Sequence, residues 1–216
     1  TDFSGSLRGT PYFGPLREPL KRLAGGEENL FPAEAAIDTA VLVALYRAAE
    51  ALSAGERGPV MRVLGVRFDM LNISWIYRSL RYFDLTPEER IARLLPCRYR
   101  LQAGSLRKMA RSANLEEFWP VMKSTVYGAA FAESPPTEEM AMDRDLRRFI
   151  LKTAHSIFRR GSPDLSTLIA YLTLLESEVT DLTTLIEDVR YDYDRRHAAL
   201  FLARPLIPGG EVRWQW

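Results

Sequence analysis

The acids near the C-terminal end are the residues of this sequence whose types and spacing could do chemistry. Glu176, Glu178 and Asp181 stand close together in one predicted helix, and carboxylates of this kind could hold a metal or serve an isoprenoid-synthase type of reaction. Such chemistry requires acids that face one another across two helices, as Asp-Asp-x-x-Asp pairs or Glu-x-x-His repeats. Only Asp69 echoes the cluster elsewhere, so the sequence does not favour a catalytic role for it.

Few residues could support catalysis or metal binding by histidine, because the chain holds only two histidines. Asp194 and His197 are three residues apart and could form two ligands of a metal site, but no third ligand accompanies them. His155 lies beside Ile157 and Phe158, which is typical of a core or boundary histidine. The phosphate-binding, dinucleotide-binding and nucleophilic-serine motifs are all missing from the sequence. We therefore predict no catalytic, cofactor-binding or metal-binding residue and no cofactor.

Basic residues form two clusters along the chain. The formal net charge is only +1, which does not favour a nucleic-acid groove. Solvated helix faces or sites for an acidic protein partner agree better with this balance. The clusters are Arg90, Arg93, Arg98, Arg100, Arg107, Lys108 and Arg111 in the first, and Arg144, Arg147, Arg148 and Lys152 in the second.

The composition is that of an ordinary globular chain, with 216 residues of which 47% are hydrophobic and 26% charged. The single cysteine, Cys97, excludes a disulfide within the chain and indicates a reducing compartment. The chain opens on Thr1 with no signal peptide, so we expect a processed chain or a piece of a longer one. The most apolar stretch, 35–52, carries three charged residues, so we predict a buried helix and no membrane span.

The chain is organised around the stretch from Leu165 to Val189. Its apolar residues recur with steps of three and four, which predicts a long amphipathic helix with a stripe to bury. The segment 161–164 predicts the helix start, with Ser162 as the N-cap residue. Because one such helix is not stable alone in water, we expect the rest of the chain to cover it. The stripe consists of Leu165, Leu168, Leu172, Leu175, Val179, Leu182, Ile186 and Val189.

A second part of the chain resembles this helix. Residues 69–82 match 178–191, and 34–38 match 139–143 at nearly the same spacing. Two matches in the same order predict an internal duplication of roughly a hundred residues. The alternative is that acid-rich amphipathic helices resemble one another without common descent.

The remaining patterns are helical as well, and no convincing strand pattern occurs. Thr86 and Asn114 each precede a glutamate by three residues, which predicts two capped helix starts, whereas the segment 55–59 predicts a turn. We thus predict an all-α fold of long antiparallel helices in repeats of roughly 105–109 residues. The expected helices cover about 32–53, 60–83, 86–96, 114–126, 138–158, 165–189 and a last one through about 203.

The positions of glycine and proline along the chain predict the domain organisation. We expect an irregular lead-in over 1–33, with at most a short helix near 16–23, because nine of these residues are glycine or proline. Two helical repeats with a linker and a tail then follow. These four segments are 34–131 for the first repeat, 132–137 for the linker, 138–204 for the second repeat and 205–216 for the tail.

Two runs carry a resemblance to a known family. The run from Asp69 to Pro96 contains Asp-Met-Leu-Asn-Ile and Leu-Thr-Pro-Glu-Glu, and the run from Leu168 to Tyr191 contains Tyr-Leu-Thr-Leu-Leu-Glu-Ser-Glu. They resemble the C subunit of archaeal and bacterial V/A-type rotary ATPases, whose eukaryotic relative is the d subunit. The likeness covers most of residues 30–192. It departs from the family where Leu175 replaces a common lysine, and in having two repeats where the family has three.

The resemblance implies a mechanical function. The family's repeats form a funnel that sits on the membrane rotor ring and receives the central shaft, without binding nucleotide. It therefore implies a non-catalytic rotor coupling subunit, peripheral on the cytoplasmic face, with shaft subunits and rotor ring as partners. One alternative is a helical-bundle enzyme or cofactor-binding protein that uses the acids around Glu176 and Asp194 with His197. A further alternative is a general helical adaptor.

Overall fold

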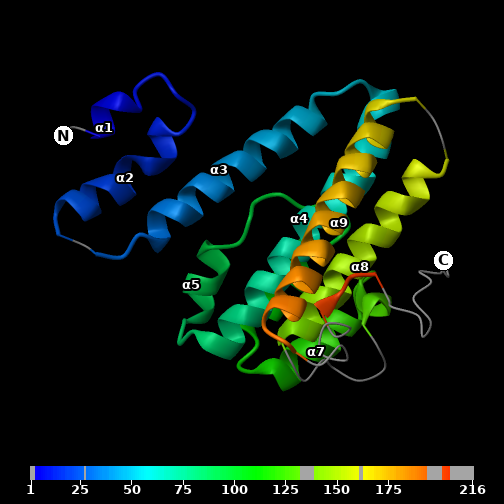
Figure 1. The fold of residues 1–216 in the computed structure, drawn as a ribbon. Coiled ribbons are helices and arrows are strands. Elements are labelled where there is room, and N and C mark those ends of the chain that lie inside the picture. Colours follow the sequence, from blue (N-terminus) through cyan, green and yellow to red (C-terminus); the bar gives the residue numbers. More distant parts are fainter. Residues whose placement is uncertain (1–2, 27, 132–138, 161–162, 194–200, 205–216) are drawn as a thin grey trace.

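The computed structural model describes residues 3–26, 28–131, 139–160, 163–193 and 201–204, and every regular element among them is a helix (Figure 1). The predicted all-α class is confirmed, and the internal duplication stays a prediction. The elements are α1 Phe3–Ser6, α2 Phe13–Ala24, α3 Phe31–Glu50, α4 Ala54–Tyr82, α5 Pro87–Ala92, α6 Ala103–Arg111, α7 Leu115–Lys123, the 3₁₀ turn η1 Gly128–Ala130, α8 Glu139–Phe158 and α9 Leu165–Arg190.

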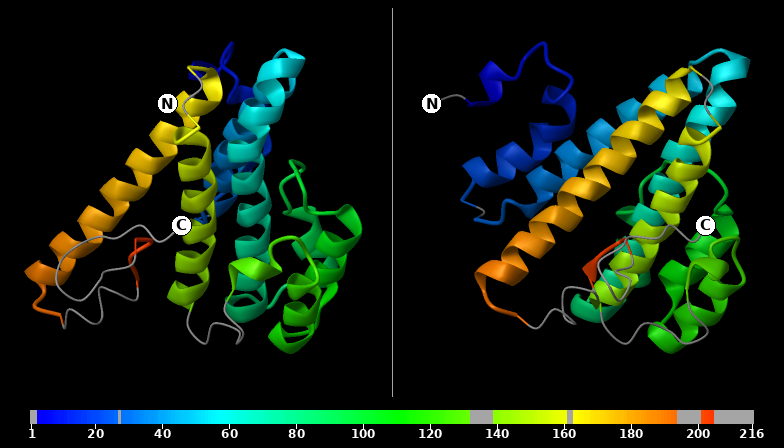
Figure 2. Two further views of the ribbon diagram at one scale, coloured as in Figure 1. Left: turned by 90° about the vertical axis from the view of Figure 1, so that its right-hand side faces the viewer. Right: turned by 45° about the vertical axis from the view of Figure 1, so that its right-hand side comes forward.

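Helix α4 is the centre of the fold. It packs against α3, α8 and α9 and against a lobe formed by α5, α6 and α7. Figure 2 shows this lobe and α9 on opposite sides of α4. Large apolar side chains fill the core, because an aromatic or branched residue on one face of a long helix gains most from contact with several neighbours. The core residues with least exposure include Met70, Ile73, Ile76 and Tyr77 of α4, Met109 of α6, Phe118 and Met122 of α7, and Met142 of α8.

The N-terminal elements lie apart from this core. Helices α1 and α2 stand away from α4, α8 and α9, and α3 joins them to the bundle (Figure 1). Leu16 of α2 is buried, and Phe31 at the start of α3 stacks on Trp75 of α4 with ring centroids 6.4 Å apart. The predicted short helix near 16–23 is therefore present as α2.

A buried carboxylate on α4 fixes the chain that leads into the lobe. Asp69 is fully buried and accepts hydrogen bonds from the backbone N–H groups of Tyr99, Arg100 and Leu101 at 2.9, 2.7 and 2.9 Å. It also accepts the hydroxyl proton of Tyr127. Burial and this bond raise the pKa of Tyr127 far above its usual range, so the phenol stays a donor. Four donors satisfy a charge that would otherwise be costly to bury.

A similar anchor occurs on α4 and on α9. Asn72 accepts the backbone N–H of Leu95 at 2.8 Å. Asp181 accepts the backbone N–H groups of Ala203 and Arg204 at 3.0 and 3.1 Å. The separation in sequence between Asn72 and Asp181 equals that between Leu95 and Arg204. This agreement supports the predicted duplication. In both segments, a polar side chain at the matching helix position binds a backbone N–H group at the matching position further along the chain.

Several boundaries differ from the predicted ones. The turn predicted over 55–59 is wrong, because α4 begins at Ala54. Ser53 precedes it in an extended conformation and donates its hydroxyl to the Glu56 side chain at 2.6 Å, within the first turn. Pro59 then lies inside α4, where it costs one backbone hydrogen bond close to the exposed helix end.

The caps of the later helices are partly as predicted. Thr86 forms a capping box with Glu89, and Asn114 accepts the N–H of Glu117 at 3.0 Å, which confirms both predicted starts. The cap of α9 is Asp164 rather than the predicted hydroxyl of Ser162. Helix α9 ends at Arg190, and most of the predicted last helix lies outside the described residues. Residues 202–204 are not helical, and the predicted linker 132–137 and tail 205–216 also lie outside.

Candidate partner-binding face

Helix α9 packs into the bundle through a face of small and polar side chains. This face meets α8 and α4 and recurs with steps of three and four, like the apolar stripe. Small residues let two helix backbones approach closely. Ile169 and Leu174 add partly buried apolar contacts at the edge of this face. Its members are Ser166, Ala170, Thr173, Ser177, Asp181, Thr184 and Asp188, all buried or half-buried.

The apolar stripe of α9 points away from this contact. All eight of its residues are exposed, from 37% for Leu165 to 81% for Val189. The expectation that the chain itself would bury them is wrong. Burial follows the face that meets α8 and α4, and no described residue covers the opposite face. We name these eight residues, from Leu165 to Val189, the α9 stripe.

The corresponding positions of α4 behave in the opposite way. When 69–82 is aligned with 178–191 and the alignment is extended backwards, the counterparts of Leu172, Leu175 and Val179 are apolar as well. In α4 they lie in the core, against the lobe, α8 and the inner side of α9. The five buried counterparts of the α9 stripe are Val63, Val66, Met70, Ile73 and Tyr77, each at most 4% exposed.

Helix α3 adds a second exposed apolar surface, so the prediction of a buried helix over 35–52 is wrong. Ile37, Val41 and Leu45 recur every four residues and are 37–46% exposed. This spacing is the signal that could have identified them. Ile169 of α9 and Tyr46 of α3 pack against the same core cluster, so the two helices approach each other at this end. They diverge from that end in Figure 1, so exposed apolar residues line two separating helices.

The three acids considered as candidate catalytic or metal-binding residues form ion pairs or hydrogen bonds within the chain. Glu176 forms a two-bond ion pair with Arg67 at 2.6 and 2.8 Å. Glu178 pairs with Arg204 at 3.5 Å, and Asp181 holds backbone N–H groups. Among the described residues, no group of three His, Cys, Asp or Glu side chains could hold a metal. The geometry thus assigns these acids to helix packing and to anchoring the chain.

A cavity of about 430 Å³ lies between α4, α8 and α9. Arg67 and Glu176 line it with their ion pair. Asp143 also lines it and is bonded to Arg78 and to Ser74, the latter at 3.1 Å. The carboxylates at this cavity therefore already have cationic partners.

One histidine lines a hollow together with Glu178, and the other lies outside the described residues. His155 is half-buried beside a hollow of about 500 Å³ that Arg159 and Arg204 also line. Burial, followed by these two cations, lowers the pKa of His155. The proposed pair of Asp194 and His197 lies outside the described residues.

The two basic clusters have different surroundings. In the second cluster, Arg147 donates to the carbonyl of Phe201 at 2.8 Å, and Arg148 to that of Leu202 at 3.2 Å. In the first cluster, Arg90 is buried and donates to the carbonyl of Ser112 at 2.8 Å. The other six members of the first cluster are exposed. The second cluster therefore fixes residues 201–204, which lie between α8 and α9 in Figure 2.

Comparison with known proteins agrees with this architecture. The family of the ATP synthase (C/AC39) subunit matches residues 1–198. None of the curated proteins compared with the chain matches it. Within the described ranges, no helix has both the length and the apolar character that crossing a bilayer requires. Because the match covers most of the sequence, the chain belongs to the ATP synthase (C/AC39) subunit family.

Proposed function

We propose that this chain is a non-catalytic coupling subunit of the central stalk in a V/A-type rotary ATPase. It links the central shaft to the membrane rotor ring and transmits torque during proton or sodium transport. In this proposal it is peripheral on the cytoplasmic face of the membrane. Family membership supports the complex, and the long packed helices suit a part that must resist twisting.

The observation that carries the proposal is the exposed α9 stripe. A folded chain rarely leaves eight apolar residues in one line on a helix unless another protein covers them. A straight stripe with heptad spacing fits a long helix as its partner, because such helices pair along seams of this kind. We assign this role to an apolar helix of the shaft.

The domain proposal follows from the same comparison. We propose that 34–131 and 138–204 are two repeats, each with a long helix whose polar residue anchors the following chain. Asn72 and Asp181 support this proposal through their matching bonds. In the first repeat, the rest of the chain covers the apolar residues of α4. In the second repeat, the partner protein covers the α9 stripe.

The test is co-migration of the chain with shaft subunits of a rotary ATPase from the same source on a sizing column. We expect an equimolar complex with the unchanged chain. The double variant Leu172→Glu, Leu182→Glu should weaken it at least about 30-fold, because each half-exposed leucine contributes about 1 kcal/mol when covered. Leu172 and Leu182 are 53% and 51% exposed, so the variant should fold normally.

A matched control carries two new charges on the same helix but outside the stripe. Thr183→Glu and Thr180→Glu are at exposed positions. Because Thr180 lines the cavity beside Arg67 and Glu176, circular dichroism must show that the control is folded. This control should bind the shaft subunits like the unchanged chain. Equal binding of the stripe variant and the control would contradict the role of the stripe.

A general helical adaptor is the second candidate, and the same exposed stripe favours it. It predicts stable, stripe-dependent binding to a protein that is no rotor part, with no binding to the shaft. The co-migration experiment separates the two candidates, because only the coupling subunit requires the shaft.

A further inference from the structure

The segment 93–111 has an unusual distribution of charge. It contains six basic residues and no acidic residue in 19 positions, although the whole chain is nearly neutral at +1. The basic residues are Arg93, Arg98, Arg100, Arg107, Lys108 and Arg111. We name these six residues the basic face.

All six side chains of the basic face are exposed. None of them forms an ion pair with a carboxylate in the described parts of the chain. Unpaired cations at this density repel one another, so their positive field remains available to a partner. The basic face is therefore a strongly charged surface. Hydrogen bonds with Thr86 lower the pKa of Glu89, and of the basic face only Arg93 is close enough to this carboxylate to add to that effect.

The backbone beneath the basic face is held in place. Asp69 binds the N–H groups of residues 99–101, and Asn72 binds that of Leu95. Helix α6 follows directly and carries Arg107 and Arg111 on its solvent side. The cations are thus displayed from a fixed surface rather than from a loose tail.

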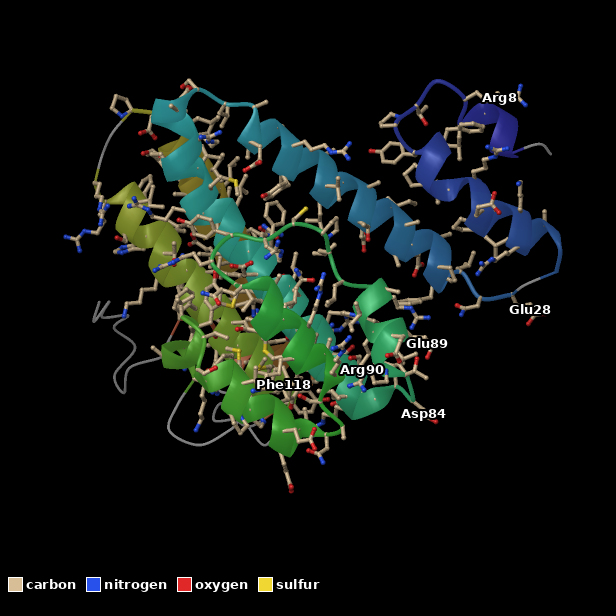
Figure 3. The ribbon with its side chains drawn as sticks, turned by 180° about the vertical axis from the view of Figure 1, so that it is seen from behind. Arg8, Glu28, Asp84, Glu89, Arg90 and Phe118 are labelled. Carbon is tan, nitrogen blue, oxygen red and sulfur yellow. The ribbon has the colours of Figure 1, made fainter. Side chains whose placement is uncertain are left out.

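The basic face and the α9 stripe point to different partners. Helix α6 and the preceding segment lie on the side that faces the viewer in Figure 3, where Arg90 and Phe118 are labelled, and α9 lies behind them. Figure 2 also separates the lobe from α9 by α4. A partner that covers the stripe therefore leaves the basic face open.

The chemistry of the basic face favours lipid over protein. Protein interfaces take most of their binding energy from a few tryptophan, tyrosine and arginine anchors that pack together in a desolvated centre. Among large apolar residues of 93–111, only Tyr99 is exposed, at 36%. Long, hydrated cations without such anchors suit a fluid layer of anionic headgroups, which can move to meet each charge. We propose that the basic face binds anionic phospholipid headgroups at a membrane surface.

The test measures sedimentation of the full chain with phospholipid vesicles. We expect binding to vesicles with about 30% phosphatidylserine in phosphatidylcholine, and loss of binding as salt rises to about 0.5 M. Each cation near such a surface strengthens binding about fivefold. The triple variant Arg107→Gln, Lys108→Gln, Arg111→Gln should therefore bind about 100-fold more weakly.

The matched control removes three exposed cations elsewhere, with Arg17→Gln, Arg57→Gln and Arg62→Gln. It has the same net charge as the test variant and should bind within about threefold of the unchanged chain. Circular dichroism checks that both variants are folded.

Three results would overturn the proposal. The first is equal binding of the triple variant and the unchanged chain. The second is equal binding to vesicles of phosphatidylcholine alone, which would indicate insertion of apolar residues. The third is no vesicle binding together with salt-sensitive binding to polyglutamate, which would indicate an acidic protein partner. None of these results depends on the coupling role.

Discussion

Helices α4 and α9 carry closely related apolar patterns and use them differently. In α4 the pattern lies in the core, and fourteen of its 29 residues are buried. In α9 the corresponding residues face solvent, and the four buried residues of its 26 are Ser166, Ala170, Asp181 and Asp188. The lobe of α5–α7 covers α4, whereas no described element covers the outer side of α9.

The difference shows that an apolar pattern predicts which side chains will be buried in a contact. It does not predict whether the contact is with the same chain or with another protein. Ile73 makes such a contact within the chain, where it is fully buried. Leu182, its counterpart in α9, is 51% exposed. Under the proposed function, the neighbour of Leu182 is another protein. Four predictions test this comparison.

The largest effect is expected at the two polar anchors. Asp69→Ala leaves three backbone donors and the hydroxyl of Tyr127 without their acceptor, so the free energy of unfolding should fall by about 3–5 kcal/mol. Asp181→Ala releases two backbone donors and should cost about 1–3 kcal/mol. Urea unfolding followed by circular dichroism measures both. A larger loss for Asp181→Ala would reverse the order of the two anchors.

The next prediction compares the α9 stripe directly with its buried counterpart in α4. Ile73→Ala should lower the free energy of unfolding by about 2–5 kcal/mol, because it empties part of the core. Leu182→Ala should change it by at most about 0.5 kcal/mol. The same unfolding assay measures both variants. If they cost the same, the α9 stripe is covered within the chain and the comparison fails.

A smaller effect concerns the ion pair between the two helices. Arg67 and Glu176 occupy corresponding positions of α4 and α9 and bind each other directly. Their side chains are 40% and 57% exposed, so solvent screens the pair, and Glu176→Gln should cost at most about 1 kcal/mol. The cost should shrink when unfolding is repeated at high salt. A cost well above about 1 kcal/mol would make this pair a main support of α9 rather than a minor one.

The sequence predicted the helices of this fold better than their surroundings. The extent of α9 and the caps at Thr86 and Asn114 follow from local patterns and were correct. The start of α4 was missed because Pro59 suggested a turn, while the Ser-x-x-Glu spacing of Ser53 and Glu56, which is typical of a helix start, was overlooked. Local sequence patterns predict the backbone conformation over about one helix turn. The correct predictions concern features within this range.

Contacts between distant parts of the chain were beyond such patterns. Asp69 was noted only as an echo of the acid cluster, although it holds residues 99–101. Its position in an apolar stretch was the available signal, because a buried acid needs several donors. Which face of α9 meets α8 could not be decided either, since both faces repeat every three or four residues.

The central claim is that shaft subunits cover the α9 stripe, and thiol labelling tests it most directly. Cys97 is the only cysteine, is 1% exposed and has a pKa raised by burial, so it should not compete. A maleimide should label Leu182→Cys and Glu187→Cys readily in the isolated chain, because both positions are exposed. In the complex with shaft subunits, we expect Leu182→Cys to be labelled at least about tenfold more slowly and Glu187→Cys, beside the stripe, to change little. Unchanged labelling of Leu182→Cys within a complex that co-migrates on the column would contradict the account.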